Sequence, residues 1–313
     1  MFKKIKSFWK KMRTPKPFKY GYMETGDGHQ IYYAIFGNKK GTPIINFNGG
    51  PAWYFDNKDA LRFNLKSQKV IMFDQRGGGR SLPYGEAKNN ETKHLISDAK
   101  KLLSHLNIDQ KVIVTGTSWG SALAVLFASK YPKEVSKLVL KDFFNGLETV
   151  DKWIFEDSKS FYPELYNQFI KDVPKGTHPF EYYNKQLHSK KYSDRKKAAN
   201  NFTSYEFALG SLNPNNLPKE WLTERFVKQN QLKLHYMVNK YFMKKNEVVK
   251  TVSKIKHIPC IIIHNRLDMI CPVEGAYNFA KDYGKKCKLI IVDELGHGGL
   301  KNKKEFVKQL KKL

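Results

Sequence analysis

Residues 111–129, KVIVTGTSWGSALAVLFAS, decide the fold of this chain. The β-branched run Val112–Thr115 predicts a buried strand, and the apolar run after the turn predicts a helix. Between them, Ser118 is flanked at a spacing of two residues by Gly116 and Gly120. This G-x-S-x-G pattern is typical of a nucleophile elbow, a turn so tight that side chains at the glycines would collide with the neighbouring strand and helix. We therefore predict that Ser118 projects from the carboxyl edge of a sheet as a nucleophile.

Strand and helix patterns alternate on both sides of this elbow. Before the break in the pattern, they are a hairpin over 21–37, strands at 43–47 and 70–73, a helix over 92–106, the elbow and a strand at 138–140. After the break, they are a strand at 260–264, a helix over 272–283, a strand at 288–292 and a closing helix around 306–313. Such alternation predicts an α/β fold with a mostly parallel sheet covered by helices on both faces.

The alternation stops between residues 145 and 250, a region rich in Tyr, Phe, Trp, Asn and Lys. Helix-length segments around 151–161, 193–209 and 219–245 predict a helical cap inserted into the fold. With 313 residues, the chain is long enough for one large core and such an insertion. We expect an α/β core of 18–144 and 251–313, a cap of 145–250, and a basic N-terminal segment of 1–17.

The net charge of +27 is spread over lysines along the whole chain and is accompanied by no recognisable nucleic-acid motif. We therefore expect no nucleic-acid partner. Cys260, Cys271 and Cys287 form no metal-ligand spacing, so we expect no metal, no cofactor and a reducing, cytoplasmic location. No apolar run reaches the roughly 20 residues of a membrane span.

The N-terminal segment 1–17 carries Phe2, Ile5, Trp9 and Met12 at helical spacing among lysines. This pattern suits a weak contact with an anionic membrane surface. A solvated leader, ended by prolines, is the other interpretation and the one we favour.

A serine nucleophile needs a base, and the base needs a group that orients it. Asp268 follows the predicted strand at 260–264, and His297 follows the strand at 288–292. The order Ser118, Asp268, His297 is the order expected in an α/β-hydrolase. Asp293 and Glu294 are rival acids, but they lie so close to His297 in sequence that reaching back to it is awkward. We predict Ser118, Asp268 and His297 as the catalytic residues.

Acyl transfer also needs backbone N–H donors for the oxyanion. Trp119, directly after the nucleophile, supplies one, and the turn 48–51 after the third strand supplies the other, for which we predict Gly50. The Gly-rich loop 74–81 does not match a phosphate-binding loop. We predict that it braces the site, with Arg76 and Arg80 in internal salt bridges.

Five motifs in this order, NGGP, DQRGGGRS, GTSWGS, RLDMICP and GHGG, resemble the proline iminopeptidase branch of the α/β-hydrolase family. The resemblance covers nearly all of the predicted core and is looser in the cap. It implies a cytoplasmic serine exopeptidase that releases an N-terminal residue, preferably proline, from short peptides. It also implies the triad Ser118, Asp268 and His297.

In that family, cap glutamates hold the free amino group of the substrate, and the resemblance places one of them at Glu206. Three positions depart from the family pattern. Asn48 replaces a histidine and Ala52 replaces a glycine in the oxyanion turn, and Lys233 stands where a second cap glutamate is expected. A lysine there would repel an ammonium group.

Prolyl aminopeptidase activity is therefore the first hypothesis, with a short peptide or another small acyl compound as substrate. The alternative is an esterase or amide hydrolase of the same fold, because fold and triad do not determine the substrate. A third class, a non-catalytic binding module, is disfavoured by the intact triad. The cap aromatics suit an apolar pocket for the N-terminal residue, or equally the core of the cap.

Overall fold

A computed structural model describes residues 14–146, 151–211, 222–293 and 296–313. Most of the N-terminal segment 1–17, for which a solvated leader and a weak membrane contact are the two interpretations, therefore lies outside the described residues. Within them, no helix has both the length and the apolar character that crossing a lipid bilayer requires.

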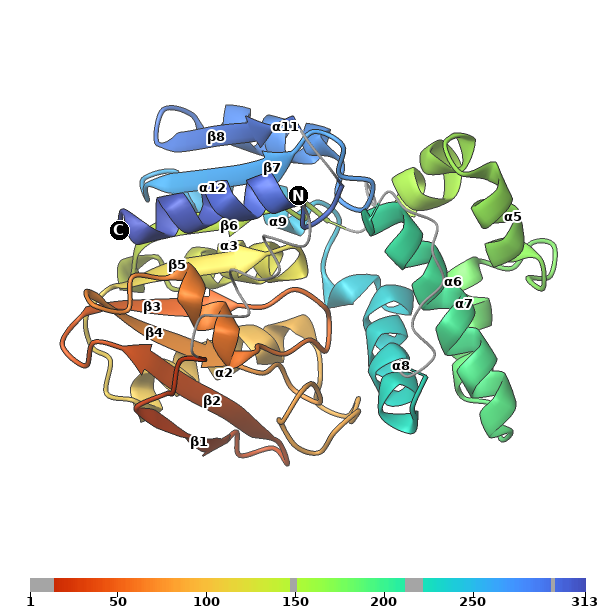
Figure 1. The fold of residues 1–313 in the computed structure, drawn as a ribbon, viewed down its shortest axis with the longest axis horizontal. Helices are drawn as coiled ribbons and strands as arrows, with labels where there is room; N and C mark the ends of the chain where they lie inside the picture. Colours follow the sequence, from red (N-terminus) through yellow and green to blue (C-terminus); the bar gives the residue numbers. More distant parts are fainter. Residues whose placement is uncertain (1–13, 147–150, 212–221, 294–295) are drawn as a thin grey trace.

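An eight-stranded sheet forms the centre of the molecule (Figure 1). Its strands are β1 (Lys19–Glu24), β2 (Gln30–Gly37), β3 (Thr42–Phe47), β4 (Gln68–Phe73), β5 (Val112–Thr117), β6 (Val135–Lys141), β7 (Cys260–Asn265) and β8 (Cys287–Val292), in the order β1-β2-β4-β3-β5-β6-β7-β8. The predicted hairpin β1–β2 is antiparallel, β2 pairs antiparallel with β4, and all other pairs are parallel. The predicted mostly parallel α/β sheet is confirmed.

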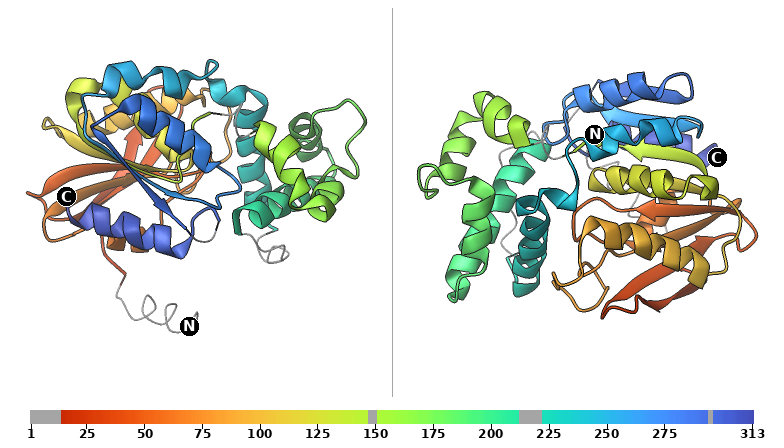
Figure 2. Two further views of the ribbon diagram at one scale, coloured as in Figure 1. Left: turned by 90° about the horizontal axis from the view of Figure 1, so that it is seen from above. Right: turned by 180° about the vertical axis from the view of Figure 1, so that it is seen from behind.

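Helices cover both faces of this sheet. The helices of the core are η1 (Asn57–Arg62), α2 (Thr92–His105), α3 (Trp119–Lys130), η2 (Pro132–Glu134), α11 (Val273–Tyr283) and α12 (Leu300–Lys311). Alternate strand residues point to opposite faces: Ile45 belongs to the core cluster that includes residues of α2, α3 and α11, whereas its neighbour Ile44 belongs to the cluster that includes residues of η1 and α12. Seen from above in Figure 2, α12 lies on one face and α11 on the other.

The helices of the predicted cap lie beside the sheet, to its right in Figure 1. They are η3 (Trp153–Asp157, a π-helix), η4 (Ser158–Ser160), α5 (Pro163–Ile170), α6 (Pro179–Leu187), α7 (Tyr192–Ser211), α8 (Glu224–Val238) and η6 (Lys240–Phe242). The single helix predicted over 219–245 is wrong at its carboxyl end, because Tyr241 has a left-handed backbone with φ 54°.

Two cap helices, α5 and α6, escaped prediction from the sequence. Both begin at a proline, Pro163 and Pro179, a residue that suits the first helical turn but otherwise signals a loop. Two short helices, α9 (Glu247–Lys250) and α10 (Val252–Ile255), contact the core helix α3. We propose that the chain returns to the core at α9, a few residues before the predicted boundary of 251.

Candidate active site

Ser118 lies between β5 and α3 with φ 55° and ψ −130°, a strained conformation for a residue with a side chain. Both flanking glycines are required by close backbone contacts. A Cβ at Gly116 would lie 2.2 Å from the carbonyl oxygen of Gly120, and a Cβ at Gly120 would lie 2.3 Å from that of Phe47. The predicted tight turn is therefore present, and it holds Ser118 at the carboxyl edge of the sheet.

His297 and Asp268 meet at the same edge. The Nδ1 atom of His297 lies 2.8 Å from Oδ2 of Asp268, and the other carboxylate oxygen accepts hydrogen bonds from the backbone N–H groups of Ile270 (2.9 Å) and Cys271 (2.8 Å). Asp268 is 2% exposed. Because the carboxylate accepts from Nδ1–H, the Nε2 atom of His297 is left as the proton acceptor.

The rival acid Asp293 is exposed and forms an ion pair with Arg266 instead. Glu294, the other rival, lies outside the described residues. Asp268 is thus the carboxylate that the structure brings to His297.

The electrostatics of this pair favour a charged His297–Asp268 couple. Burial disfavours the charged form of His297, but the adjacent Asp268 carboxylate outweighs it and raises the pKa of His297 above its usual value. Burial likewise acts to raise the pKa of Asp268, but the charge and hydrogen bond of His297 hold that pKa below its usual range. Asp268 therefore stabilises the imidazolium that forms when His297 accepts a proton.

A second buried carboxylate, Asp142, lies beside this pair and was not predicted. Its Oδ2 accepts a hydrogen bond from the N–H of Gly298 (3.1 Å) and forms an ion pair with Lys141. The preceding residue is also tied to the nucleophile, because the N–H of Ser118 donates to the carbonyl of Lys141 (2.9 Å). The signal available in the sequence was an acidic residue two positions after the strand at 138–140.

Asp142, Asp268 and His297 offer ligand atoms that all lie within 4.8 Å of one another. Each of these groups already has a partner. Lys141 forms an ion pair with Asp142, and the Nδ1–H group of His297 donates a hydrogen bond to Asp268. The three groups therefore act as a hydrogen-bonded and ion-paired cluster.

The predicted oxyanion donors come from two turns that meet over Ser118. A cavity of about 290 Å³ is lined by Ser118, His297 and the turn residues Gly49 and Gly50. Trp119 is the first residue of α3, so its N–H has no acceptor within that helix. The structure thus brings both turns to the nucleophile.

Gln75 holds the 48–51 turn in place from the loop after β4. Its side-chain amide donates to the carbonyls of Asn48 (2.8 Å) and Gly49 (3.0 Å) and accepts from the N–H of Ala52 (3.2 Å). Gln75 is 2% exposed. One buried side chain therefore binds both carbonyl and N–H groups of this turn.

Asn48, which departs from the family pattern, belongs to a directional network beneath the turn. Thr115 donates to Asn46 (2.9 Å), Asn46 donates to the Asn48 side-chain carbonyl (3.0 Å), and the Asn48 amide donates to the carbonyl of Phe73 (2.9 Å). Because the last acceptor is a backbone carbonyl, each amide can have only one orientation. Asparagine therefore fits this position as part of a satisfied buried network.

Glu206 lies on α7 and forms an ion pair of 2.5 Å with Lys233 of α8. The same face of α7 meets the catalytic histidine one turn later: a Cβ at Gly210 would lie 3.8 Å from the Cβ of His297. Glu206 therefore lies on the helix face that approaches His297 one turn later, and its carboxylate is paired with the lysine that departs from the family pattern.

Salt bridges brace the loop 74–81, as predicted. Arg76 is 1% exposed and holds both carboxylate oxygens of Asp98 (2.5 and 2.8 Å) as well as Asp27 (2.8 Å). Arg80 pairs with Asp74 (2.7 Å). These arginines are occupied within the protein, in agreement with a structural role.

Comparison with known proteins agrees with this geometry. The family model described as alpha/beta hydrolase fold matches residues 42–303. The proline iminopeptidase of Arabidopsis thaliana is 30% identical over 90% of this chain and 76% of its own length. The proline iminopeptidase of Neisseria meningitidis serogroup B is 30% identical over 90% of this chain and 91% of its own.

Solved structures share the fold at lower identity. VinJ has a TM-score of 0.66 at 15% identity, over 94% of this chain and 97% of its own. An esterase from Exiguobacterium antarcticum has a TM-score of 0.61 at 18% identity, over 92% of this chain and 97% of its own. On the family match and the relatives at 30% identity, this chain belongs to the proline iminopeptidase branch of the α/β-hydrolase family.

Proposed function

We propose that this protein is a serine exopeptidase that releases an N-terminal proline, or another small or apolar residue, from short peptides. The observation that carries the proposal is the His297–Asp268 hydrogen bond of 2.8 Å at the cavity that Ser118 also lines. The relatives named proline iminopeptidase support the choice of substrate class.

In this mechanism, the Oγ of Ser118 attacks the carbonyl carbon of the N-terminal residue while Nε2 of His297 accepts its proton. The N–H groups of Gly50 and Trp119 bind the oxyanion. Protonated His297 then donates to the leaving nitrogen, so the peptide bond breaks and an acyl-enzyme forms on Ser118. Water, deprotonated by His297, then attacks this ester, and His297 returns the proton to Oγ of Ser118 as the ester bond breaks and the free amino acid leaves.

Glu206 is the proposed anchor for the α-ammonium group of the N-terminal residue. Its position on the face of α7 that meets His297 supports this role. Its pairing with Lys233 predicts weaker amine binding than a free carboxylate would provide. An esterase or amide hydrolase of the same fold is the alternative that this pairing favours.

Hydrolysis of proline, alanine and leucine arylamides beside a short-chain acyl ester separates the two hypotheses. We expect the proline arylamide to be the best substrate and Ser118→Ala to lose activity by about 10⁴-fold or more. Turnover of the ester without any arylamide would contradict the peptidase proposal. Full activity of Ser118→Ala on either substrate would exclude the mechanism.

We also propose a cytoplasmic location. All three cysteines are thiols in the structure. They include Cys260 and Cys287, which lie opposite one another in the neighbouring strands β7 and β8. A chain with few cysteines and no disulfide framework suits a reducing compartment.

A further inference from the structure

Two aromatic side chains beside the nucleophile have no role in the mechanism described above. Trp53 and Tyr54 are 46% and 45% exposed, and their rings stack with centroids 5.5 Å apart and planes 22° apart. Large exposed aromatic surfaces of this kind are characteristic of binding sites.

Both rings line the cavity of about 290 Å³ that Ser118 and His297 also line. Within the described part of the chain, no residue of the cap helices lines this cavity. The aromatic pair therefore shares this cavity with Ser118 and His297 but with none of the described cap residues.

The backbone that carries the pair is held rigidly. The side-chain carbonyl of Gln75 accepts from the N–H of Ala52 (3.2 Å), and the backbone N–H of Gln75 donates to the carbonyl of Trp53 (3.4 Å). The glycines of the 74–81 loop leave room for this segment: a Cβ at Gly79 would lie 2.4 Å from the Cβ of Tyr54. Ala52 itself has a left-handed φ of 64°. These contacts hold the backbone of residues 52–54 in place and so fix the positions from which the two rings project.

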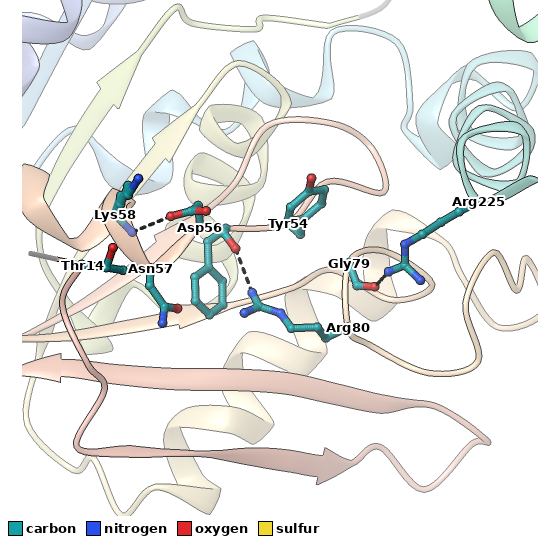
Figure 3. Close-up of a pocket in the computed structure, with 9 residues that line it drawn as sticks. Thr14, Tyr54, Asp56, Asn57, Lys58, Gly79, Arg80 and Arg225 are labelled. Carbon is teal, nitrogen blue, oxygen red and sulfur yellow. Dashed lines mark hydrogen bonds between the residues drawn. The ribbon is translucent and has the colours of Figure 1, made fainter. Parts of the chain in front are cut away.

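Cap helix α8 secures the same loop. Its Arg225 donates to the carbonyl of Gly79 and lies over the ring of Tyr84, at 3.8 Å from the ring centroid. Figure 3 shows Tyr54 near the hydrogen bond between Arg225 and Gly79, with Arg80 and Arg225 on opposite sides of Gly79. Tyr54 thus stands at a junction between the nucleophile cavity and a second cavity lined by Arg80 and Arg225.

The chemistry identifies which part of a peptide would reach the rings. His297 must protonate the leaving nitrogen, so the leaving peptide lies beside His297. The amino group of the released residue belongs to the acyl part and is assigned to Glu206 in the cap. The cavity without cap residues is therefore the side of the leaving peptide.

We propose that Trp53 and Tyr54 form a leaving-group subsite that binds an aromatic side chain on the second residue of the peptide. The proposal rests on the proposed peptidase function. A charged side chain is not favoured, because Asp59 and Arg62, the charged residues beside the rings in this cavity, pair with each other at 2.5 Å. Stacking of an aromatic side chain of the peptide on Trp53 and Tyr54 is therefore the interaction that this cavity favours.

The first test compares kcat/KM for the dipeptides Pro-Phe and Pro-Gly. We expect a preference for Pro-Phe of roughly tenfold, the size of one favourable aromatic contact with its buried area. Trp53→Ala and Tyr54→Ala should each reduce this preference and leave Pro-Gly nearly unchanged, whereas Trp53→Phe should retain most of it. Tyr277→Ala is the matched control, because Tyr277 is 56% exposed on α11 and does not line the cavity. Equal rates for both dipeptides, or equal losses on both in Trp53→Ala, would overturn the proposal.

The second test separates the subsite from the peptidase activity. Once the acyl-enzyme has formed, an added amine can occupy the leaving-group side and capture the acyl group in place of water. With an acyl-enzyme formed from either an arylamide or an ester, we expect phenylalanine amide to capture it several-fold better than glycine amide. Trp53→Ala should abolish this difference. If only the ester acylates the enzyme, the proposed peptidase function fails while this experiment still decides the subsite. Equal capture by both amines would contradict the subsite itself.

Discussion

Two carboxylates act on His297, and they belong to different strand ends. Asp268 contacts its ring directly, whereas Asp142 holds the next residue, Gly298, and pairs with Lys141. Asp142 raises the pKa of His297 and Lys141 lowers it. The pKa of His297 therefore depends on the buried Asp142–Lys141 ion pair as well as on Asp268.

This arrangement predicts opposite pH effects for two substitutions. His297 must be neutral to accept a proton, so kcat/KM should fall as the pH drops through its raised pKa. Asp142→Asn removes a negative charge, lowers the pKa of His297 and should shift the acid limb of the profile to lower pH by roughly one unit. Lys141→Met removes a positive charge and should shift it to higher pH. The same direction of shift in both variants would contradict the assignment, and pH profiles of kcat/KM measure it.

A second prediction at this scale concerns the glycines. Gly116→Ala would place a methyl group 2.2 Å from the carbonyl oxygen of Gly120, an atom that cannot move away easily, and should lower the free energy of unfolding by about 1–3 kcal/mol. Gly210→Ala is the control. Its methyl group would make only ordinary contacts, 3.6 Å from Ile270, and alanine suits a helix. Urea unfolding should show a lower midpoint for Gly116→Ala alone, and equal midpoints would contradict the argument.

At the scale of elements, helices α7 and α8 carry the proposed binding site for the substrate amine. They carry Glu206 and Lys233, which lie 2.5 Å apart and are both partly exposed. The pair is nevertheless largely buried, so solvent screens its charges less than those of a surface pair. We therefore expect Lys233 to compete with a substrate ammonium group for the carboxylate of Glu206.

Lys233→Met should lower KM for the proline arylamide by roughly fivefold, because it frees the carboxylate of Glu206 for the substrate ammonium. KM for an acyl ester without an amino group should not change, which makes the ester the internal control. Glu206→Gln should raise KM for the arylamide alone. Unchanged KM values in both variants would show that Glu206 does not anchor the amine.

At the scale of the whole molecule, the elements specified by short-range patterns could be predicted. The elbow at Ser118, the hairpin β1–β2 and the strand ends that carry Asp268 and His297 follow from periodicity and from the common polarity of parallel strands. Their meeting at one edge of the sheet is a consequence of that polarity.

Features that depend on long-range packing could not be predicted in the same way. The pairing of Lys233 with Glu206 needs two cap helices in register. Asp142 becomes a neighbour of His297 only once β6 is placed between β5 and β7. The approach of Trp53 to the nucleophile depends on how the 74–81 loop supports the turn, which no local spacing records.

The placement of the proposed site at the ends of β5, β7 and β8 has a consequence for synthesis of the protein. Ribosomes make the nucleophile Ser118 first, then the acid Asp268, and the base His297 last of the three. On the proposed assignment, Ser118 lacks its proton acceptor until β8 has paired with β7 and His297 has followed it. We therefore expect the nascent chain to be inert towards the peptides around it until translation has passed His297.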